Sequence, residues 1–277
     1  MKKLHVLLAS DIHNCHLTWY GMDNAARMKD FVRCITEEKE RTSYDLTLIL
    51  GDVSLDFWGW NEGGSYLWNP SVSRTKEFIE TVAPVLPKPM YILPGNHEQY
   101  APEDWLRVTG QPREQIVVTP LAVFVMLDAF SGDLGPDFNS DGTYLPVNVP
   151  LIRKALNENP DVPVFLCAHW FDMEKESAEL KELLKTESRI KALFMGHDHR
   201  CAVSYTGEDA GNRPMIRTGN FSYSGEKDDF RKCYRGWREL TVYEDGSFET
   251  RYIVPEQTIP LENPEIMPAH TQDEYCG

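Results

Sequence analysis

Side chains that bind metal ions follow several apolar runs of this sequence. Five short polar groups contain them: Asp11-Ile12-His13, Gly51-Asp52, Gly95-Asn96-His97-Glu98, Ala168-His169 and Gly196-His197-Asp198-His199. Five of the eight histidines lie in these groups. Carboxylate, amide and imidazole ligands together suit first-row cations such as Mn²⁺, Fe²⁺ or Zn²⁺. The groups therefore predict a metal site that needs no thiolate.

Each group taken alone also has an ordinary structural explanation. Gly51-Asp52 is common turn chemistry, and Asn96 suits a left-handed turn. A histidine after an apolar run, such as His169, is most often a hydrogen-bonded core residue. The order and joint placement of all five groups favour the metal site over five unrelated loops.

The apolar runs that precede these groups have the length of strands buried on both faces. They are Leu4–Ala9, Leu46–Leu50, Met90–Leu93, Leu121–Leu127, Val164–Ala168 and Ala192–Met195. Amphipathic stretches with helical spacing lie between several of them, at residues 28–35, 78–82 and 180–184, and Pro150 is placed to begin another helix. This alternation predicts an α/β fold. Strand ends in such folds converge on one edge of the sheet, where loops build sites.

The pattern predicts one domain over residues 1–254 and a Pro-rich C-terminal tail over residues 255–277. From Cys201 onward the elements become short and extended, and Asp245-Gly246 indicates a hairpin turn. Residues 57–68 form an aromatic, Gly-rich insertion shortly after Asp52. It either walls the site or forms a small hydrophobic cluster of its own.

Composition restricts the class of protein and its partners. With 277 residues, 42% hydrophobic and 26% charged, the chain has ordinary globular usage. Its net charge of −15 disfavours nucleic acid and anionic membranes as partners. No run approaches the roughly 18 apolar residues of a membrane span. Six cysteines are too sparse for a disulfide scaffold, which favours reduced thiols and a cytoplasmic location. The sequence does not indicate an oligomeric state.

A pair of divalent ions accounts for the whole donor set. A carboxylate that bridges two cations about 3.5–4 Å apart lets both polarise one hydroxide and one phosphoryl group. Asp52 is the natural bridge in this set.

In order, the five groups resemble the motifs D-x-H, G-D, G-N-H-[D/E], H and G-H-x-H of the calcineurin-like metallophosphoesterases. The resemblance spans Asp11 to His199, about two thirds of the chain. It implies one metal ion held by Asp11, His13, Asp52 and His199, and a second held by Asp52, Asn96, His169 and His197. It leaves His97 to protonate the leaving group or stabilise the transition state. It also implies a four-layer αββα sandwich, with two mixed β-sheets flanked by helices.

The resemblance implies an enzyme, a metal-dependent hydrolase of phosphoric esters. A hydroxide bridging two divalent or mixed-valence ions (Mn²⁺, Fe²⁺/Fe³⁺ or Zn²⁺) would attack phosphorus. The segment Gly51–Phe57 lacks the arginine of the G-D-x-x-D-R-G motif of protein Ser/Thr phosphatases, which disfavours a phosphoprotein substrate. A small-molecule phosphodiester is the first expectation, because no basic cluster is evident for a dianionic monoester. A phosphomonoesterase, a nuclease and a non-catalytic protein-binding scaffold are the alternatives.

Three further groups lie close to these motifs in the sequence. His16 and Arg200 fit solvated surface positions better than the site, and residues 220–223 fit packing as well as an approach to the metals.

Overall fold

The computed structural model describes most of the chain. The described residues are 2–15, 18–19, 22–57, 73–132, 134, 142–222, 235–255 and 274–276. The aromatic insertion beyond Phe57 and most of the predicted tail lie outside them. Among the described residues, no helix combines the length and apolar character needed to cross a membrane.

The first sheet has the strand order β14-β13-β12-β1-β4-β5. Its strands are β1 (Lys3–Ala9), β4 (Leu46–Leu50), β5 (Met90–Leu93), β12 (Trp237–Tyr243), β13 (Phe248–Ile253) and β14 (Glu274–Cys276). β1, β4 and β5 run parallel, whereas β12, β13 and β14 pair antiparallel with their neighbours. The predicted hairpin turn joins β12 to β13, with Gly246 at a φ of 81°.

The second sheet has the strand order β10-β11-β9-β8-β7-β6. Its strands are β6 (Gln115–Val118), β7 (Val123–Leu127), β8 (Val164–Ala168), β9 (Ile190–Met195), β10 (Val203–Tyr205) and β11 (Pro214–Arg217). The four inner strands run parallel, and the edge strands β6 and β10 are antiparallel to them. A separate short ribbon pairs β2 (Thr18–Trp19) with β3 (Met22–Asp23).

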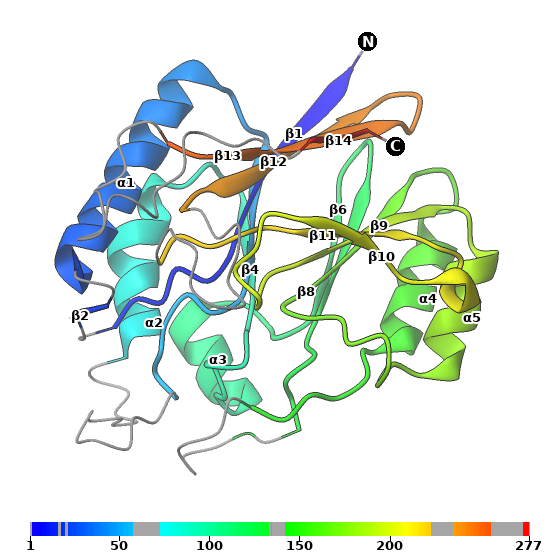
Figure 1. The fold of residues 1–277 in the computed structure, drawn as a ribbon, viewed down its shortest axis with the longest axis horizontal. Coiled ribbons are helices and arrows are strands. Elements are labelled where there is room, and N and C mark those ends of the chain that lie inside the picture. The colour runs from blue at the N-terminus through cyan, green and yellow to red at the C-terminus, as the bar shows by residue number, and fades with distance from the viewer. Residues whose placement is uncertain are drawn as a thin grey trace.

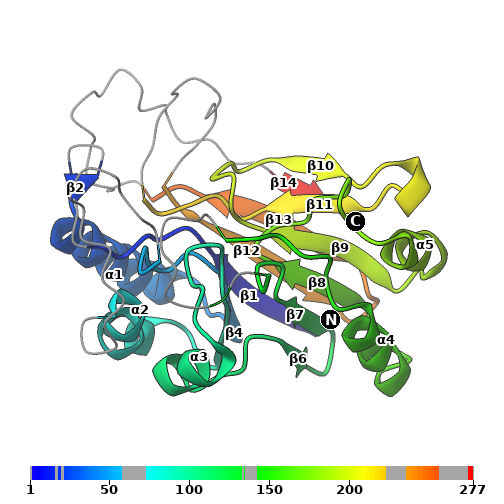
Figure 2. The ribbon, with the colours of Figure 1, turned by 90° about the horizontal axis from the view of Figure 1, so that it is seen from below.

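Helices cover the outer face of each sheet. The first sheet carries α1 (Asn24–Arg41), α2 (Arg74–Glu77) with its π-helical continuation Phe78–Val82 and 3₁₀ turn Ala83–Val85, and α3 (Pro102–Thr109). The second carries α4 (Val149–Glu158), α5 (Ala178–Thr186) and the 3₁₀ turn Glu208–Ala210. Figures 1 and 2 show α1 to α3 on one side of the paired sheets and α4 and α5 on the other.

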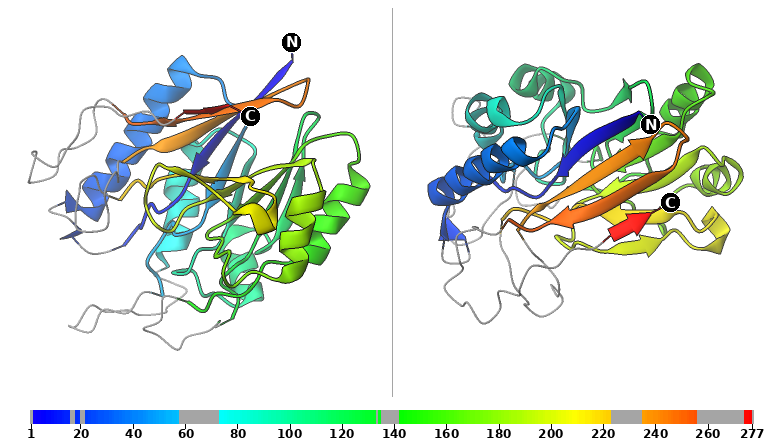
Figure 3. Two further views of the ribbon diagram at one scale, coloured as in Figure 1. Left: turned by 45° about the vertical axis from the view of Figure 1, so that its right-hand side comes forward. Right: turned by 90° about the horizontal axis from the view of Figure 1, so that it is seen from above.

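The core between the sheets explains why the strand sequences are unbroken apolar runs. On β1, Val6 and Leu8 face the second sheet, whereas Leu7 and Ala9 face the helices, and all four are buried. Both faces of the inner strands therefore exclude water. The predicted four-layer αββα sandwich of two mixed sheets is confirmed, and Figure 3 shows it from two further directions.

The sequence located the buried strands better than the peripheral elements. Leu46–Leu50, Met90–Leu93 and Val164–Ala168 match their observed bounds. The edge strand β6 and the helix α3 were not predicted. The helical stretch expected at residues 78–82 is π-helical rather than α-helical.

Phe165 lies at the centre of the inter-sheet core, and its truncation tests the sandwich. Its ring centroid is 5.5 Å from that of Phe124, 5.9 Å from that of Phe194 and 5.2 Å from that of Phe248. Phe165→Ala should lower the free energy of unfolding by about 3–5 kcal/mol in urea titrations. The control Leu106→Ala, at a side chain that is 51% exposed, should change it by less than about 0.5 kcal/mol. Equal small effects would contradict the packing.

Candidate metal centre

The five polar groups meet at the carboxyl edge of the paired sheets. The first sheet supplies Asp11 and His13 after β1, Asp52 after β4 and Asn96 after β5. The second sheet supplies its residues after β8 and β9: His169, His197 and His199. Three groups of possible metal donors form there, each with ligand atoms within 4.8 Å of one another: Asp11/His13/His199, His13/Asp52/His97 and Asp52/His169/His197.

Strained backbone is concentrated at this edge. Five of the site residues have left-handed main chains, with φ between 50° and 70°: Asp11, His13, Asp52, His197 and His199. Among the described residues, Asn212 is the one other non-glycine residue with positive φ. Such conformations cost about 1–3 kcal/mol each and persist only where the surroundings enforce them. The strained main chain therefore lowers the stability of the fold but holds these side chains in position.

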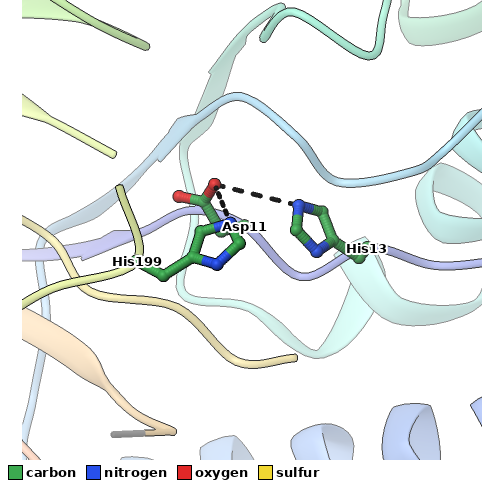
Figure 4. A group of neighbouring side chains, drawn as sticks. All are labelled: Asp11, His13 and His199. Carbon is green, nitrogen blue, oxygen red and sulfur yellow. Dashed lines mark ion pairs between the residues drawn. The ribbon is translucent and has the colours of Figure 1, made fainter. Parts of the chain in front are cut away.

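Asp11 is oriented so that one carboxylate oxygen faces the first donor set. Its Oδ2 accepts hydrogen bonds from Ser10 Oγ at 2.5 Å and from the main-chain N–H of His197 at 3.0 Å. Its Oδ1 lies 3.2 Å from His199 Nε2 and 3.8 Å from His13 Nε2, and Figure 4 shows it turned toward both rings. This fully buried oxygen has no hydrogen-bond donor among the described residues. A cation held between the three side chains would satisfy it.

The second donor set gathers around Asn96. Its Oδ1 lies 3.0 Å from His169 Nε2 and 2.9 Å from His197 Nδ1. His169 Nδ1 is 2.7 Å from the carbonyl oxygen of Leu50. With its Nδ1 proton donated there, the ring presents Nε2 to the site, the usual way a metal-binding histidine is oriented.

Asp52 lies between the two sets. Its Oδ2 is 3.2 Å from His169 Nε2, 3.5 Å from His13 Nε2 and 3.7 Å from His97 Nε2. Its Oδ1 accepts the main-chain N–H of His97 at 3.1 Å. One carboxylate oxygen of Asp52 therefore faces ring nitrogens of both sets.

The ionisation of the site reflects closely packed opposite charges. Burial opposes protonation of His169, but the carboxylates of Asp52 and Asp11 outweigh it and raise the pKa of its imidazole to about 10. Burial lowers the pKa of His13 and of His197 to about 4. Burial alone would raise the pKa of Asp52, yet His169 and His97 hold it well below its usual range. At neutral pH Asp52 is thus ionised and His169 is protonated, whereas His13 and His197 are neutral. A cation that binds His169 would displace its proton, since metal ligands must be deprotonated.

Glu98 organises the loops around Asp52, a role that the motif pattern did not reveal. Its buried carboxylate accepts main-chain N–H bonds from Asp52, Ser54 and Gly95, each 2.8 Å long. Burial, with the nearby charge of Asp52, raises the pKa of Glu98 to about 8. The approach at Gly95 is so close that a Cβ there would lie 2.1 Å from Asp52 Oδ1, which explains the glycine.

A buried ion pair joins this loop to the second sheet. Arg113 donates to the carbonyls of Glu98 at 3.0 Å and Tyr100 at 2.7 Å, and its Nε lies 2.6 Å from Asp128 Oδ2. Asp128 Oδ1 accepts the N–H of Phe130, whose ring packs 5.7 Å from that of His169. The two halves of the site are therefore fixed relative to each other.

The loop after β11 and helix α1 hold the main chain of the site. The N–H of Phe221 bonds the carbonyl of Asp11 at 3.1 Å, and Asn220 Nδ2 bonds the carbonyl of His199 at 3.1 Å. Arg27, buried in α1, donates to the carbonyl of His13 at 2.5 Å. Asn220 and Phe221 thus hydrogen-bond the main chain of two candidate metal-binding residues. Tyr223 and His16 lie outside the described residues.

One side of the site is open. Asp11, His13, Asp52, Asn96 and His169 are buried, whereas His197, Asp198 and His199 are partly exposed. Among the described residues, the donors are therefore most exposed on the side of residues 197–199.

The fold and this donor set define a dinuclear metal-dependent phosphoesterase. Residues 4–201 match the sequence profile of the calcineurin-like phosphoesterases, and the chain belongs to that family. The resemblance identified from the motifs is confirmed.

Solved structures share the fold at low sequence identity. A dimetal phosphatase from Danio rerio superposes with a TM-score of 0.60 at 11% identity, covering 90% of this chain and 95% of that one. The purple acid phosphatase from yellow lupin seeds superposes with a TM-score of 0.56 at 10% identity, covering 99% of this chain and 53% of that one. GAP50, the anchor in the inner membrane complex of Plasmodium, superposes with a TM-score of 0.54 at 14% identity, covering 92% of this chain and 85% of that one. A search of curated proteins finds no match.

His197 and His199 lie on one loop yet face different donor sets, which gives a matched pair of variants. His197→Ala and His199→Ala should each lower bound metal from about two ions per chain to about one, measured by elemental analysis after Mn²⁺ loading and desalting. The double variant should lose both ions. His5→Ala, in the first half of β1, should retain both ions. Full loss in either single variant would contradict two separable sets.

Proposed function

We propose that the protein is a phosphodiesterase that holds two metal ions in the donor sets described above. The observation that carries this proposal is the position of Asp52 Oδ2, 3.5 Å from His13 Nε2 in the first set and 3.2 Å from His169 Nε2 in the second. The ligands are Asp11, His13, Asp52 and His199 for one ion and Asp52, Asn96, His169 and His197 for the other. When bound, two such ions supply a hydroxide at neutral pH and neutralise charge on the phosphoryl oxygens.

The protein residues orient the reaction. Asp52 holds the two sets at a fixed separation, and Glu98 fixes the main chain of Asp52. His97 takes no part in either ligand set; its Nε2 lies 3.7 Å from Asp52 Oδ2, beside both sets. From there it donates a proton to the departing alkoxide as a general acid.

The charges near the site favour a diester over a dianionic monoester. Arg217 is paired with Asp198, and Arg27 is buried behind His13, where it binds a carbonyl. In the described part of the chain, these two cations are thus already engaged by protein oxygens. The net charge of −15 likewise disfavours a nuclease. The complete donor set and His97 argue against a non-catalytic scaffold.

Asp52→Asn tests the shared carboxylate. We expect Mn²⁺-dependent cleavage of bis-(para-nitrophenyl) phosphate to fall by at least about 100-fold, since even outer-shell partners of metal ligands are worth about 10- to 100-fold. Metal content should fall at both sets. The wild-type protein should cleave this diester faster than para-nitrophenyl phosphate, and chelator should abolish both activities. Full turnover in the variant would remove Asp52 from the bridging role.

His97→Ala separates protonation from metal binding. The variant should keep its metal content but lose about 100-fold or more in kcat on a diester with an alkyl leaving group. The loss on a nitrophenyl diester should be clearly smaller, because that leaving group needs less protonation. Equal losses on both substrates would rule out the acid role.

A further inference from the structure

Asp198 lies between two candidate ligands but turns its carboxylate to an arginine. It separates His197 from His199, and its Oδ2 lies 2.5 Å from Arg217 Nε. Its Oδ1 accepts the main-chain N–H of Arg200 at 3.2 Å, and the charge of the Arg200 side chain also acts on it. The side chains of Asp198 and Arg217 remain 19% and 14% exposed. The pair therefore lies on the open side of the site.

The fold fixes Arg217 in this position. It ends β11 opposite Met195, the last residue of β9 before the loop of residues 196–199. Its Nη1 donates to Ser204 Oγ at 2.7 Å, and its guanidinium carbon lies 5.7 Å from the ring centroid of Trp170. That indole is in turn 5.1 Å from the ring of His197. Trp170 thus lies between Arg217 and His197 of the candidate metal centre. The charge of Arg217 is offset by Asp198.

Phosphomonoesters and phosphodiesters differ in how strongly they respond to local charge. A phosphomonoester carries close to two negative charges at pH 7, because its second pKa is about 6. A phosphodiester carries one. Charge on residue 198 or 217 acts on a bound phosphoryl group over roughly a Debye length, about 10 Å at 0.1 M salt. A uniform change in local charge therefore affects the monoester more than the diester.

We propose that Asp198 is a specificity-determining residue: by neutralising Arg217 beside the metal centre, it keeps the site selective for monoanionic phosphodiesters against dianionic monoesters. This inference rests on the proposed function. It assigns a role to Asp198, the residue between the two histidines of the Gly196–His199 group, which supplies no donor atom to either set.

The test compares kcat/KM for para-nitrophenyl phosphate and its bis-ester in the Mn²⁺-loaded protein at low salt. Asp198→Asn should raise the monoester-to-diester ratio by about two- to tenfold, and Arg217→Gln should lower it by a similar factor. The double variant should return close to the wild-type ratio. Ser204→Ala removes a contact of Arg217 without changing charge and should leave the ratio unchanged.

Opposite signs in the two single variants distinguish charge from structure. Added salt should reduce both shifts, because it screens exposed charges. Monoester-to-diester ratios that stay constant, or that move in the same direction in both variants, would overturn the proposal. If Asp198→Asn does not fold, the ratio measured for Arg217→Gln decides the test alone. A wild-type protein with no diester preference would instead overturn the proposed function, while the opposite shifts could still be read.

Discussion

Two buried carboxylates set the requirements for the rest of this molecule. Asp11 Oδ1 and Asp52 Oδ2 each lie within 4.0 Å of three imidazole nitrogens and are almost fully shielded from water. Burying an uncompensated carboxylate costs several kcal/mol, of the order reported for desolvated ions. Divalent cations held among these oxygens and ring nitrogens would offset that cost. The left-handed main chains and the supporting hydrogen bonds serve to keep the arrangement in place.

The supporting contacts come from both sheets and from the helix layer, so the site depends on the whole sandwich. Glu98 joins the loops after β4 and β5, and Arg113 joins that unit to Asp128 at the end of β7. Ser10 fixes Asp11, while Leu50 fixes the ring of His169. These contacts are polar and mostly buried, and hydrogen bonds are electrostatically stronger in such surroundings than in water.

The sequence pointed to the candidate donors through their joint placement, because five polar groups that each have an ordinary explanation alone all follow buried strands. Asp-x-His and Gly-His-x-His after buried strands point to metals, and the unbroken strand runs predicted the sheets. The sequence could not show that Glu98 binds three main-chain N–H groups or that Asp198 faces Arg217. Those contacts depend on how separate loops pack, and no local periodicity of the sequence predicts them. The edge strand β6 was not predicted for a related reason. It has four residues and one neighbouring strand, so its sequence pattern is weak.

Anomalous diffraction from crystals grown with Mn²⁺ tests the central claim most directly. The account predicts two peaks about 3.5–4 Å apart, one on each side of Asp52 Oδ2. The first should contact Asp11, His13 and His199, and the second Asn96, His169 and His197. A single peak, or two peaks that do not share Asp52, would contradict it.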